Sequence, residues 1–319
     1  MAMITPALAL HGGCGSPAPE ALGVAEWEAL QRDLAAALRA GHAVLRGGGA
    51  ALDAVEAAVV ALEDSPHFNA GHGAALCEDG THELDASIMN GANLAAGAAC
   101  TVRRTRNPVR LARAVMERSG CVLLAGDAAD AFAQRVGLEC VPNRYFTTPR
   151  RVQALEKLKA LGRRGGIARA SEADRHGTVG AVALDAHGHL AAATSTGGYN
   201  NKPVGRVGDS PIVGAGTYAR DGVCAVSCTG MGEVFIRHVV GHELAARMRH
   251  GGATLEEASR ALMEEELAGE DVGMGWVALD AAGRLVAPFN TMGMARGWVD
   301  AEGRGWIGVH REMSCLGRL

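Results

Sequence analysis

The 319-residue sequence is poor in aromatic side chains, with five Phe, four Trp and three Tyr. It contains no run of 18 apolar residues, so we expect no membrane-spanning helix. It has no excess of positive charge, because its formal net charge is −4, and this argues against a nucleic-acid-binding protein. Hydrophobic residues make up 48% and charged residues 21%, values that exclude a disordered or low-complexity chain.

The eight cysteines form no CxxC pair, so neither a zinc ribbon nor a thioredoxin-like motif is supported. A chain of this length does not need a disulfide scaffold, and we therefore expect reduced thiols and a cytoplasmic location. The first ten residues lack a basic stretch and are too short for a signal peptide.

Glycine, by contrast, is abundant. The 44 glycines are about 14% of the chain, against roughly 7% in average proteins. Together with the shortage of aromatic residues, this excess predicts tight turns and segments of backbone that approach each other closely.

Hydrophobic periodicity predicts a chain in which strands cluster in sets instead of alternating with helices. This pattern favours an α/β chain of the layered α+β type, a four-layer αββα sandwich with antiparallel sheets. A polar, basic stretch over 143–177 is predicted to be an exposed linker. Helices are predicted over 27–45, 51–62, 109–116, 127–136, 232–249 and 254–267. Strands are predicted over 3–10, 74–77, 84–89, 95–102, 121–124, 178–185, 189–196, 212–217, 223–229 and in a hairpin over 275–289.

Thr178 stands at the first position of a predicted strand, directly after the linker. A threonine hydroxyl becomes a useful nucleophile when a base lies close, and a free α-amine on the same residue, with a pKa of about 7.7–8.0, can be that base. Such an amine requires a cut between Gly177 and Thr178. Taken alone, the segment is better explained as a linker followed by a β-branched strand residue.

Three later turns change this balance: 194–198, 205–211 and 227–233 all combine hydroxyl side chains with glycines. Such turns can offer backbone N–H groups to a substrate. Arg206 can bind a carboxylate with two hydrogen bonds and Asp209 can hold an ammonium group, which together suit an amino acid. The alternative is a surface Arg–Asp pair of little energetic consequence.

Seven short segments, taken in their order along the chain, are similar to one family. They are His11-Gly12-Gly13, Phe68-Asn69-Ala70-Gly71, Thr81-His82-Glu83-Leu84-Asp85-Ala86, His176-Gly177-Thr178-Val179-Gly180, Ala193-Thr194-Ser195-Thr196-Gly197-Gly198, Gly205 to Pro211, and Thr229-Gly230-Met231-Gly232-Glu233. On these motifs the sequence resembles the plant-type isoaspartyl peptidase/L-asparaginase family of N-terminal-nucleophile hydrolases.

The resemblance implies a single N-terminal-nucleophile hydrolase domain over residues 1–319. It implies a precursor that cuts itself between Gly177 and Thr178 into an α chain, residues 1–177 with a flexible tail over 143–177, and a β chain, residues 178–319. The expected assembly is a homodimer of precursors, (αβ)2 after cleavage. The expected substrates are L-asparagine and β-aspartyl dipeptides, with no nucleic acid, membrane or organic cofactor involved.

The resemblance also implies roles for individual residues. Thr178 would be the nucleophile and, through its freed amine, the general base, and would form a β-aspartyl ester. The other catalytic positions are Thr196, which orients Thr178, Thr229 and Gly230, which stabilise the oxyanion, and Asn69 near the nucleophile. The substrate-binding positions are Arg206 and Asp209 as carboxylate and amine anchors, with Gly232 and Gly198 lining the pocket.

The family resemblance further implies a structural sodium ion held by backbone carbonyls, and hard cations do prefer oxygen ligands. The matching positions are Leu62, Glu63, Ser65, Phe68, Ala70 and His72. One residue departs from the family pattern, because Met231 stands where a small or polar residue is usual. A longer apolar side chain there alters the pocket or its preference for a leaving group.

Three other interpretations are weaker. A glycosylasparaginase-type amidase shares the threonine nucleophile and the Gly205–Pro211 turn, but the segment after Thr178 favours the isoaspartyl branch. His238 and His242, four residues apart on one predicted helix, could belong to a metallohydrolase, but the Glu that follows the second His is misplaced for the zincin pattern. A Gly-x-Gly-x-x-Gly match over 303–308 has no room for the βαβ unit of a dinucleotide-binding fold, and a glycine-rich turn explains it better.

Overall fold

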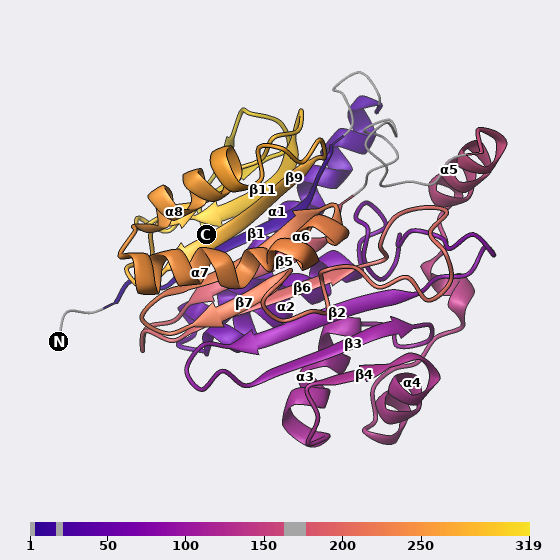
Figure 1. The fold of residues 1–319 in the computed structure, drawn as a ribbon, viewed down its shortest axis with the longest axis horizontal. Helices are drawn as coiled ribbons and strands as arrows, with labels where there is room; N and C mark the ends of the chain where they lie inside the picture. Colours follow the sequence, from indigo (N-terminus) through magenta and orange to yellow (C-terminus); the bar gives the residue numbers. More distant parts are fainter. Residues whose placement is uncertain (1–3, 17–21, 163–176) are drawn as a thin grey trace.

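The computed structural model describes residues 4–16, 22–162 and 177–319, and within them the chain forms two β-sheets (Figure 1). The larger sheet has nine strands in the order β13-β12-β11-β1-β5-β6-β2-β3-β4, and the smaller has four in the order β10-β9-β8-β7. The strands are β1 (Ala7–Cys14), β2 (Leu84–Asn90), β3 (Ala96–Val102), β4 (Leu123–Ala125), β5 (Val179–Leu184), β6 (Leu190–Thr196), β7 (Thr217–Arg220), β8 (Cys224–Gly230), β9 (Met274–Asp280), β10 (Leu285–Val286), β11 (Met294–Val299), β12 (Arg304–Gly308) and β13 (Ser314–Arg318).

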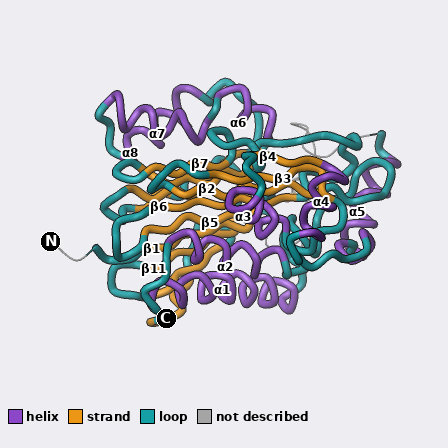
Figure 2. Tube along the Cα trace, turned by 90° about the horizontal axis from the view of Figure 1, so that it is seen from below, coloured by secondary structure: helices purple, strands orange, loops and turns teal. Residues whose placement is uncertain are grey.

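Helices cover the outer faces of both sheets, so the predicted αββα layering is confirmed (Figure 2). Helices α1 to α4 pack on the nine-stranded sheet, and helices α6 to α8 cover the four-stranded sheet. The predicted antiparallel pairing holds throughout except between β3 and β4, which run parallel. No described helix is long and apolar enough to cross a membrane. The helices are α1 (Val24–Arg46), α2 (Ala51–Glu63), α3 (Pro108–Arg118), α4 (Gly126–Arg135), α5 (Pro149–Ala160), α6 (Gly232–His238), α7 (Val240–Gly251) and α8 (Leu255–Ala261).

The alternation of side chains along β5 places the predicted nucleophile between the sheets. Val182 and Leu184 join the core that lies between the two sheets, whereas Val179 and Ala181 pack toward the core under α1 and α2. Thr178 precedes Val182 by an even number of residues, so its side chain points to the same side as Val182 does. In β6, the side chains of Leu190 and Ala192 also point into the core between the sheets. Thr196 lies an even number of residues further along, so its side chain points to the same side.

The largest correction concerns the predicted linker over 143–177. Residues Asn143–Phe146 form a 3₁₀ turn and are followed by helix α5. Phe146 is fully buried, and Arg151 is buried with its Nε donating to the carbonyl of Gly73. The basic composition predicted a linker, but the Phe146 ring and the buried Arg151 guanidinium anchor this part of the chain to the rest of the fold. The rest of the predicted linker and tail, 163–176, lies outside the described residues.

Several predicted boundaries are also wrong. The single helix expected over 232–249 is broken at Val239, whose φ of +47° is left-handed. The run 121–124, predicted as a buried strand, is a short exposed edge strand. The runs 74–77 and 212–216 are loops, and three strands after 293 were not predicted. The Gly-x-Gly-x-x-Gly match lies in one of these, β12, and not in a turn.

A chain of buried hydroxyl groups joins the two sheets. Ser227 Oγ of β8 lies 2.9 Å from His11 Nε2 of β1 and 2.7 Å from Thr194 Oγ1 of β6. Thr217 Oγ1 of β7 donates to Thr194 Oγ1, and Ser87 Oγ of β2 lies 2.8 Å from Thr217 Oγ1. All five side chains are fully buried. The four hydroxyl groups are therefore satisfied only by one another, by His11 Nε2 and by nearby carbonyls.

Replacing the central hydroxyl of this chain should destabilise the protein. Thr217→Val keeps the side-chain shape but leaves Thr194 and Ser87 short of a partner, at a cost of about 1–3 kcal/mol. The midpoint of urea denaturation should fall accordingly, whereas Thr217→Ser, which keeps the hydroxyl, should stay close to the wild type. Equal midpoints for the Val and Ser variants would contradict a stabilising role for the chain.

Candidate active site

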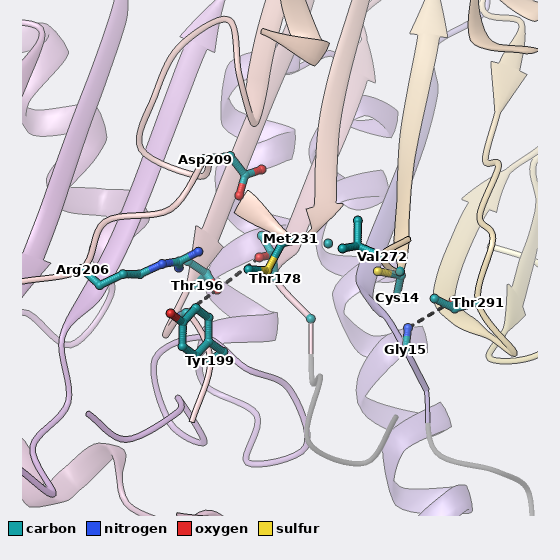
Figure 3. A pocket seen from close by; sticks show the side chains of 14 residues that line it. Cys14, Gly15, Thr178, Thr196, Tyr199, Arg206, Asp209, Met231, Val272 and Thr291 are labelled. Atoms are coloured by element: carbon teal, nitrogen blue, oxygen red, sulfur yellow. Dashed lines mark hydrogen bonds between the residues drawn. The ribbon is translucent and has the colours of Figure 1, made fainter. Parts of the chain in front are cut away.

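A cavity lies at the edge of the sandwich where β1, β6 and β8 end and where β5 and β9 begin (Figure 3). Antiparallel pairing brings these ends together, because the end of one strand lies beside the start of its neighbour. The cavity is lined by Cys14, Gly15, Gly177, Thr178, Thr196, Gly198, Tyr199, Arg206, Asp209, Gly230, Met231, Val272, Gly273 and Thr291.

Thr178 is buried at the entrance of β5 and is held by Thr196. Its Oγ1 donates to Thr196 Oγ1 over 3.1 Å, and Thr196 Oγ1 in turn accepts the N–H of Gly198 over 3.0 Å. The bond to Gly198 fixes the Thr196 hydroxyl, which then fixes the rotamer of Thr178. The two threonines predicted to act together are thus in direct contact.

Gly177 packs against the main chain of β1 and the side chain of Thr229 without room for a side chain of its own. A Cβ on Gly177 would lie 2.6 Å from Thr229 Oγ1, 2.7 Å from Gly13 Cα and 2.8 Å from the Cys14 nitrogen. A Cβ on Gly13, whose φ is +107°, would lie 2.6 Å from the Gly177 carbonyl carbon. The peptide unit between Gly177 and Thr178 is therefore held in one place beside the Thr229 hydroxyl.

Thr229 and Gly230 end strand β8 next to this peptide. Thr229 Oγ1 accepts the N–H of Cys14 over 3.1 Å, and the Cys14 thiol donates to the Thr229 carbonyl over 3.3 Å. The Thr229 hydroxyl also donates weakly to the Cys14 sulfur over 3.8 Å, and Thr229 lies behind the described residues that line the cavity. Gly230 has a φ of +149°, and a Cβ there would lie 2.7 Å from the Gly273 carbonyl oxygen. Only glycine fits this position.

Arg206 reaches the cavity from the loop after β6. Its Nε and Nη2 donate to the two carboxylate oxygens of Glu233 over 3.1 and 2.9 Å, and its guanidinium lies over the Tyr199 ring, 4.6 Å from the centroid. Burial works to lower the pKa of Arg206, but the bonds to Glu233 outweigh it and raise the pKa. Arg206 therefore remains a permanent cation in a fixed orientation.

Asp209 is a buried carboxylate with unused hydrogen-bonding capacity. Within the described residues, its Oδ2 has no hydrogen-bond partner. Burial raises the pKa of Asp209 to about 7, although the nearby Arg206 opposes the rise. Gly232 lies behind both anchors, since a Cβ there would be 2.9 Å from Arg206 Nη2 and from Asp209 Oδ1. Its lack of a side chain allows the two charged groups to lie side by side.

Asn69 bonds to the turns that lie next to Thr196 and Gly198. Its Nδ2 donates to the Gly198 carbonyl over 2.5 Å, its Oδ1 accepts the N–H of Ala75 over 2.7 Å, and its carbonyl accepts the N–H of Gly197 over 3.0 Å. It is not one of the described residues that line the cavity. Asn69 therefore fastens the turn after β6 and acts on Thr178 through Thr196 and Gly198.

The residues predicted to surround a sodium ion lie in the last turn of α2, Leu62 and Glu63, and in the loop that follows it. The loop is closed by a hydrogen bond of 2.7 Å from the His72 N–H to the Glu63 carbonyl. A Cβ on Gly73, whose φ is +106°, would lie 2.8 Å from the Phe68 carbonyl oxygen and 2.7 Å from that of Pro66. The carbonyls of Pro66 and Phe68 thus point toward Gly73, and carbonyl oxygens are ligands that hard cations prefer.

The metallohydrolase interpretation is not supported by the described residues. His238 ends α6 and His242 lies in α7, so the break at Val239 separates the two side chains that one helix was predicted to carry. His238 instead lies 3.2 Å from Glu266 and from Glu270. No group of three or more His, Cys, Asp or Glu side chains in residues 4–16, 22–162 and 177–319 is placed to hold a metal ion.

Some residues in the cavity or bonded to its lining could not be selected from the sequence. Glu233 stood inside a quoted motif, but nothing in the motif indicated that it pairs with Arg206. Cys14 and Tyr199 directly follow quoted glycine turns, and that adjacency was the only available signal. Val272 and Thr291 come from loops without any motif, and only the folded chain places them beside Thr178.

Comparisons with known proteins agree with this site. The model of the asparaginase family matches residues 4–309. The isoaspartyl peptidase of Salmonella typhimurium is 44% identical over 308 residues, which cover 96% of this chain and 98% of the relative. A probable isoaspartyl peptidase/L-asparaginase 2 of Arabidopsis thaliana is 39% identical, with 93% and 96% coverage, and the isoaspartyl peptidase/L-asparaginase of Homo sapiens is 43% identical, with 80% coverage of each chain. The chain therefore belongs to the plant-type asparaginase and isoaspartyl peptidase family of hydrolases.

Proposed function

We propose that this protein hydrolyses L-asparagine to L-aspartate and ammonia, and β-aspartyl dipeptides to L-aspartate and an amino acid. The observation that carries the proposal is the position of Thr178, whose hydroxyl lies in the cavity that also contains the cation of Arg206 and the carboxylate of Asp209. These two charges match the α-carboxylate and α-ammonium groups of an aspartyl substrate. The names of the relatives support the same substrates.

The active enzyme arises, in this proposal, when the chain cuts itself between Gly177 and Thr178. Thr178 Oγ attacks the Gly177 carbonyl carbon, the C–N bond breaks, and an ester joins the two residues. Water then hydrolyses the ester, which leaves a carboxylate on Gly177 and a free α-amine on Thr178. The packing of Gly177 beside the Thr229 hydroxyl supports this step, because that hydroxyl can donate to the oxyanion formed on the carbonyl oxygen.

In the mature enzyme the same groups act on the substrate. The α-amine of Thr178 takes the proton from Oγ, which attacks the β-carbonyl carbon, while Thr229 and Gly230 stabilise the oxyanion. The amine then gives the proton to the leaving nitrogen, and ammonia or an amino acid departs. Water, deprotonated by the same amine, hydrolyses the β-aspartyl ester on Thr178 and releases aspartate. Thr196 keeps the hydroxyl in line throughout.

The end of α2 and the loop after it would hold the sodium ion. Its backbone carbonyls at Leu62, Glu63, Ser65, Phe68, Ala70 and His72 are the proposed ligands. The His72 N–H uses one lone pair of the Glu63 carbonyl and leaves the other for a cation. A bound ion would stiffen the loop that carries Asn69 and would thereby support the turn at Gly197 and Gly198.

The remaining proposals concern the assembly and its compartment. We infer a homodimer of precursors, (αβ)2 after cleavage, in the cytoplasm. The eight cysteines, all within the described residues, form no disulfide in the structure, in keeping with a reducing compartment.

Replacing the nucleophile tests both reactions at once. Thr178→Ala should give a single uncut chain on denaturing electrophoresis and should lower asparagine hydrolysis by about 10⁴-fold or more, because both the hydroxyl and the new amine are lost. The wild type should yield a second chain whose N-terminal residue is Thr178. The exposed Thr5→Ala variant is the matched control, and activity in the Thr178→Ala protein would refute the assignment.

The packing of Gly177 predicts that a single methyl group slows maturation. Gly177→Ala places a Cβ within 2.6 Å of Thr229 Oγ1, so the cut should slow by about tenfold or more in a time course of chain cleavage. Gly251→Ala, where the new Cβ meets nothing within 4 Å, is the control. An unchanged cleavage rate in Gly177→Ala would show that the close packing does not matter for the cut.

Acid should weaken substrate binding through Asp209. Burial raises its pKa to about 7, Arg206 opposes the rise, and Glu233 and Asp85 add to it. Below that pH the carboxyl is increasingly protonated and cannot pair with an ammonium group, so the KM for asparagine should rise as the pH falls through about 7 and should approach about tenfold per unit. Protonation of the Thr178 amine lowers kcat and kcat/KM by the same factor when it affects the free enzyme and the substrate complex equally, so it leaves KM unchanged. A KM that stays constant between pH 5.5 and 8.5 would contradict the role of Asp209.

A further inference from the structure

The cavity has two sides of different chemistry. The charged groups of Arg206 and Asp209 lie on one side of Thr178 and Val272 lies on the other, while Met231 overlaps Thr178 in the view (Figure 3). The described lining residues on this second side carry no charged side chain. The other residues there are Cys14, Gly15, Gly273 and Thr291.

The polar side chains on the second side are already bonded to the protein. The Thr291 hydroxyl donates to the Gly293 carbonyl over 2.8 Å and accepts the N–H of Gly15 over 3.2 Å. The Cys14 thiol donates to the Thr229 carbonyl over 3.3 Å. What remains for a ligand on this side is therefore mainly the apolar surface of Met231 and Val272.

Both apolar side chains are held in place by the fold. Met231 precedes the first turn of α6, and Val272 lies just before β9, where its carbonyl accepts the Asn290 Nδ2–H over 2.9 Å. Both are half-buried and pack against the core between the sheets. The unbranched Met231 side chain can still adjust to ligands of different shape.

We propose that Met231 and Val272 form an apolar subsite for the amino acid that leaves, so that the favoured substrates are β-aspartyl dipeptides with an aliphatic second residue such as leucine. This inference rests on the proposed function. When Arg206 and Asp209 hold the α-groups of the substrate and Thr178 attacks its β-carbonyl, the departing nitrogen points away from the two anchors. A leucine side chain would there exchange water for apolar contact, whereas a charged side chain would lose hydration without a counter-charge.

Gly177 of the uncut chain already occupies part of this region. It lies between Gly13, Cys14 and Thr229, on the side where the departing amino acid would sit. Cleavage and departure of the Gly177 end would open the subsite. Asparagine provides an internal reference, because its leaving group is ammonia and has no side chain to contact Met231.

The test compares kcat/KM of the cleaved wild-type enzyme for asparagine, β-aspartyl-glycine, β-aspartyl-leucine and β-aspartyl-lysine. We expect the leucine dipeptide to exceed the glycine and lysine dipeptides by about tenfold or more, since a few methylene groups in an apolar pocket discriminate on that scale. Met231→Thr and Val272→Thr should each lower the ratio of leucine dipeptide to asparagine by about fivefold or more. Met231→Leu should keep that ratio, as should Met263→Thr, which alters a half-buried methionine outside the cavity.

Two results would overturn the subsite. One is a wild-type enzyme that cleaves the glycine, lysine and leucine dipeptides equally well. The other is a Met231→Thr variant in which asparagine and the leucine dipeptide lose the same factor, because the methionine would then support the site as a whole. A cleaved wild-type protein that hydrolyses none of the four compounds would instead refute the proposed function itself.

Discussion

The main chain at Gly177 passes so close to Gly13 and Thr229 that a side chain would fit at neither glycine. This contact joins three strands: β1 supplies Gly13, β8 supplies Thr229, and β5 begins one residue after Thr178. It is possible only because the two sheets pack with small residues facing each other near this edge. The sandwich, the site of the proposed cut and the oxyanion-binding threonine all depend on the same close approach of backbone.

The site combines groups that face opposite demands. Thr178 needs a hydroxyl held still by neutral partners, which Thr196 and Gly198 provide. The α-groups of an amino acid need full charges, which Arg206 and Asp209 provide a short distance away. Because Gly232 has no side chain, the Arg206 and Asp209 side chains can both lie against the start of α6. The Glu233 carboxylate keeps the Arg206 guanidinium oriented. The cavity thus changes from charged to apolar across the reacting threonine.

Much of this could be predicted from sequence, and the exceptions have physical reasons. The apolar runs of β5 and β6 are continuous because both strands are buried on two faces, so their extents and the position of Thr178 were clear. The segment 143–160 failed because a few buried residues, such as Phe146, hold a stretch whose composition is otherwise polar. The helix break at Val239 left no trace in the apolar pattern. Asn69 was placed near the nucleophile, but its three hydrogen bonds to neighbouring turns follow from tertiary contacts that no local pattern encodes.

The order of strands in the larger sheet has a consequence for any cut at Thr178. Strands β13, β12, β11, β5 and β6 would belong to the fragment 178–319. Strands β1, β2, β3 and β4 would belong to the fragment 1–177. Strands of the two fragments would therefore alternate in the sheet, with main-chain hydrogen bonds between fragments at three places: β11–β1, β1–β5 and β6–β2. The four-stranded sheet would lie wholly in the fragment 178–319, but the nine-stranded sheet would be complete in neither fragment, so neither could keep this fold alone.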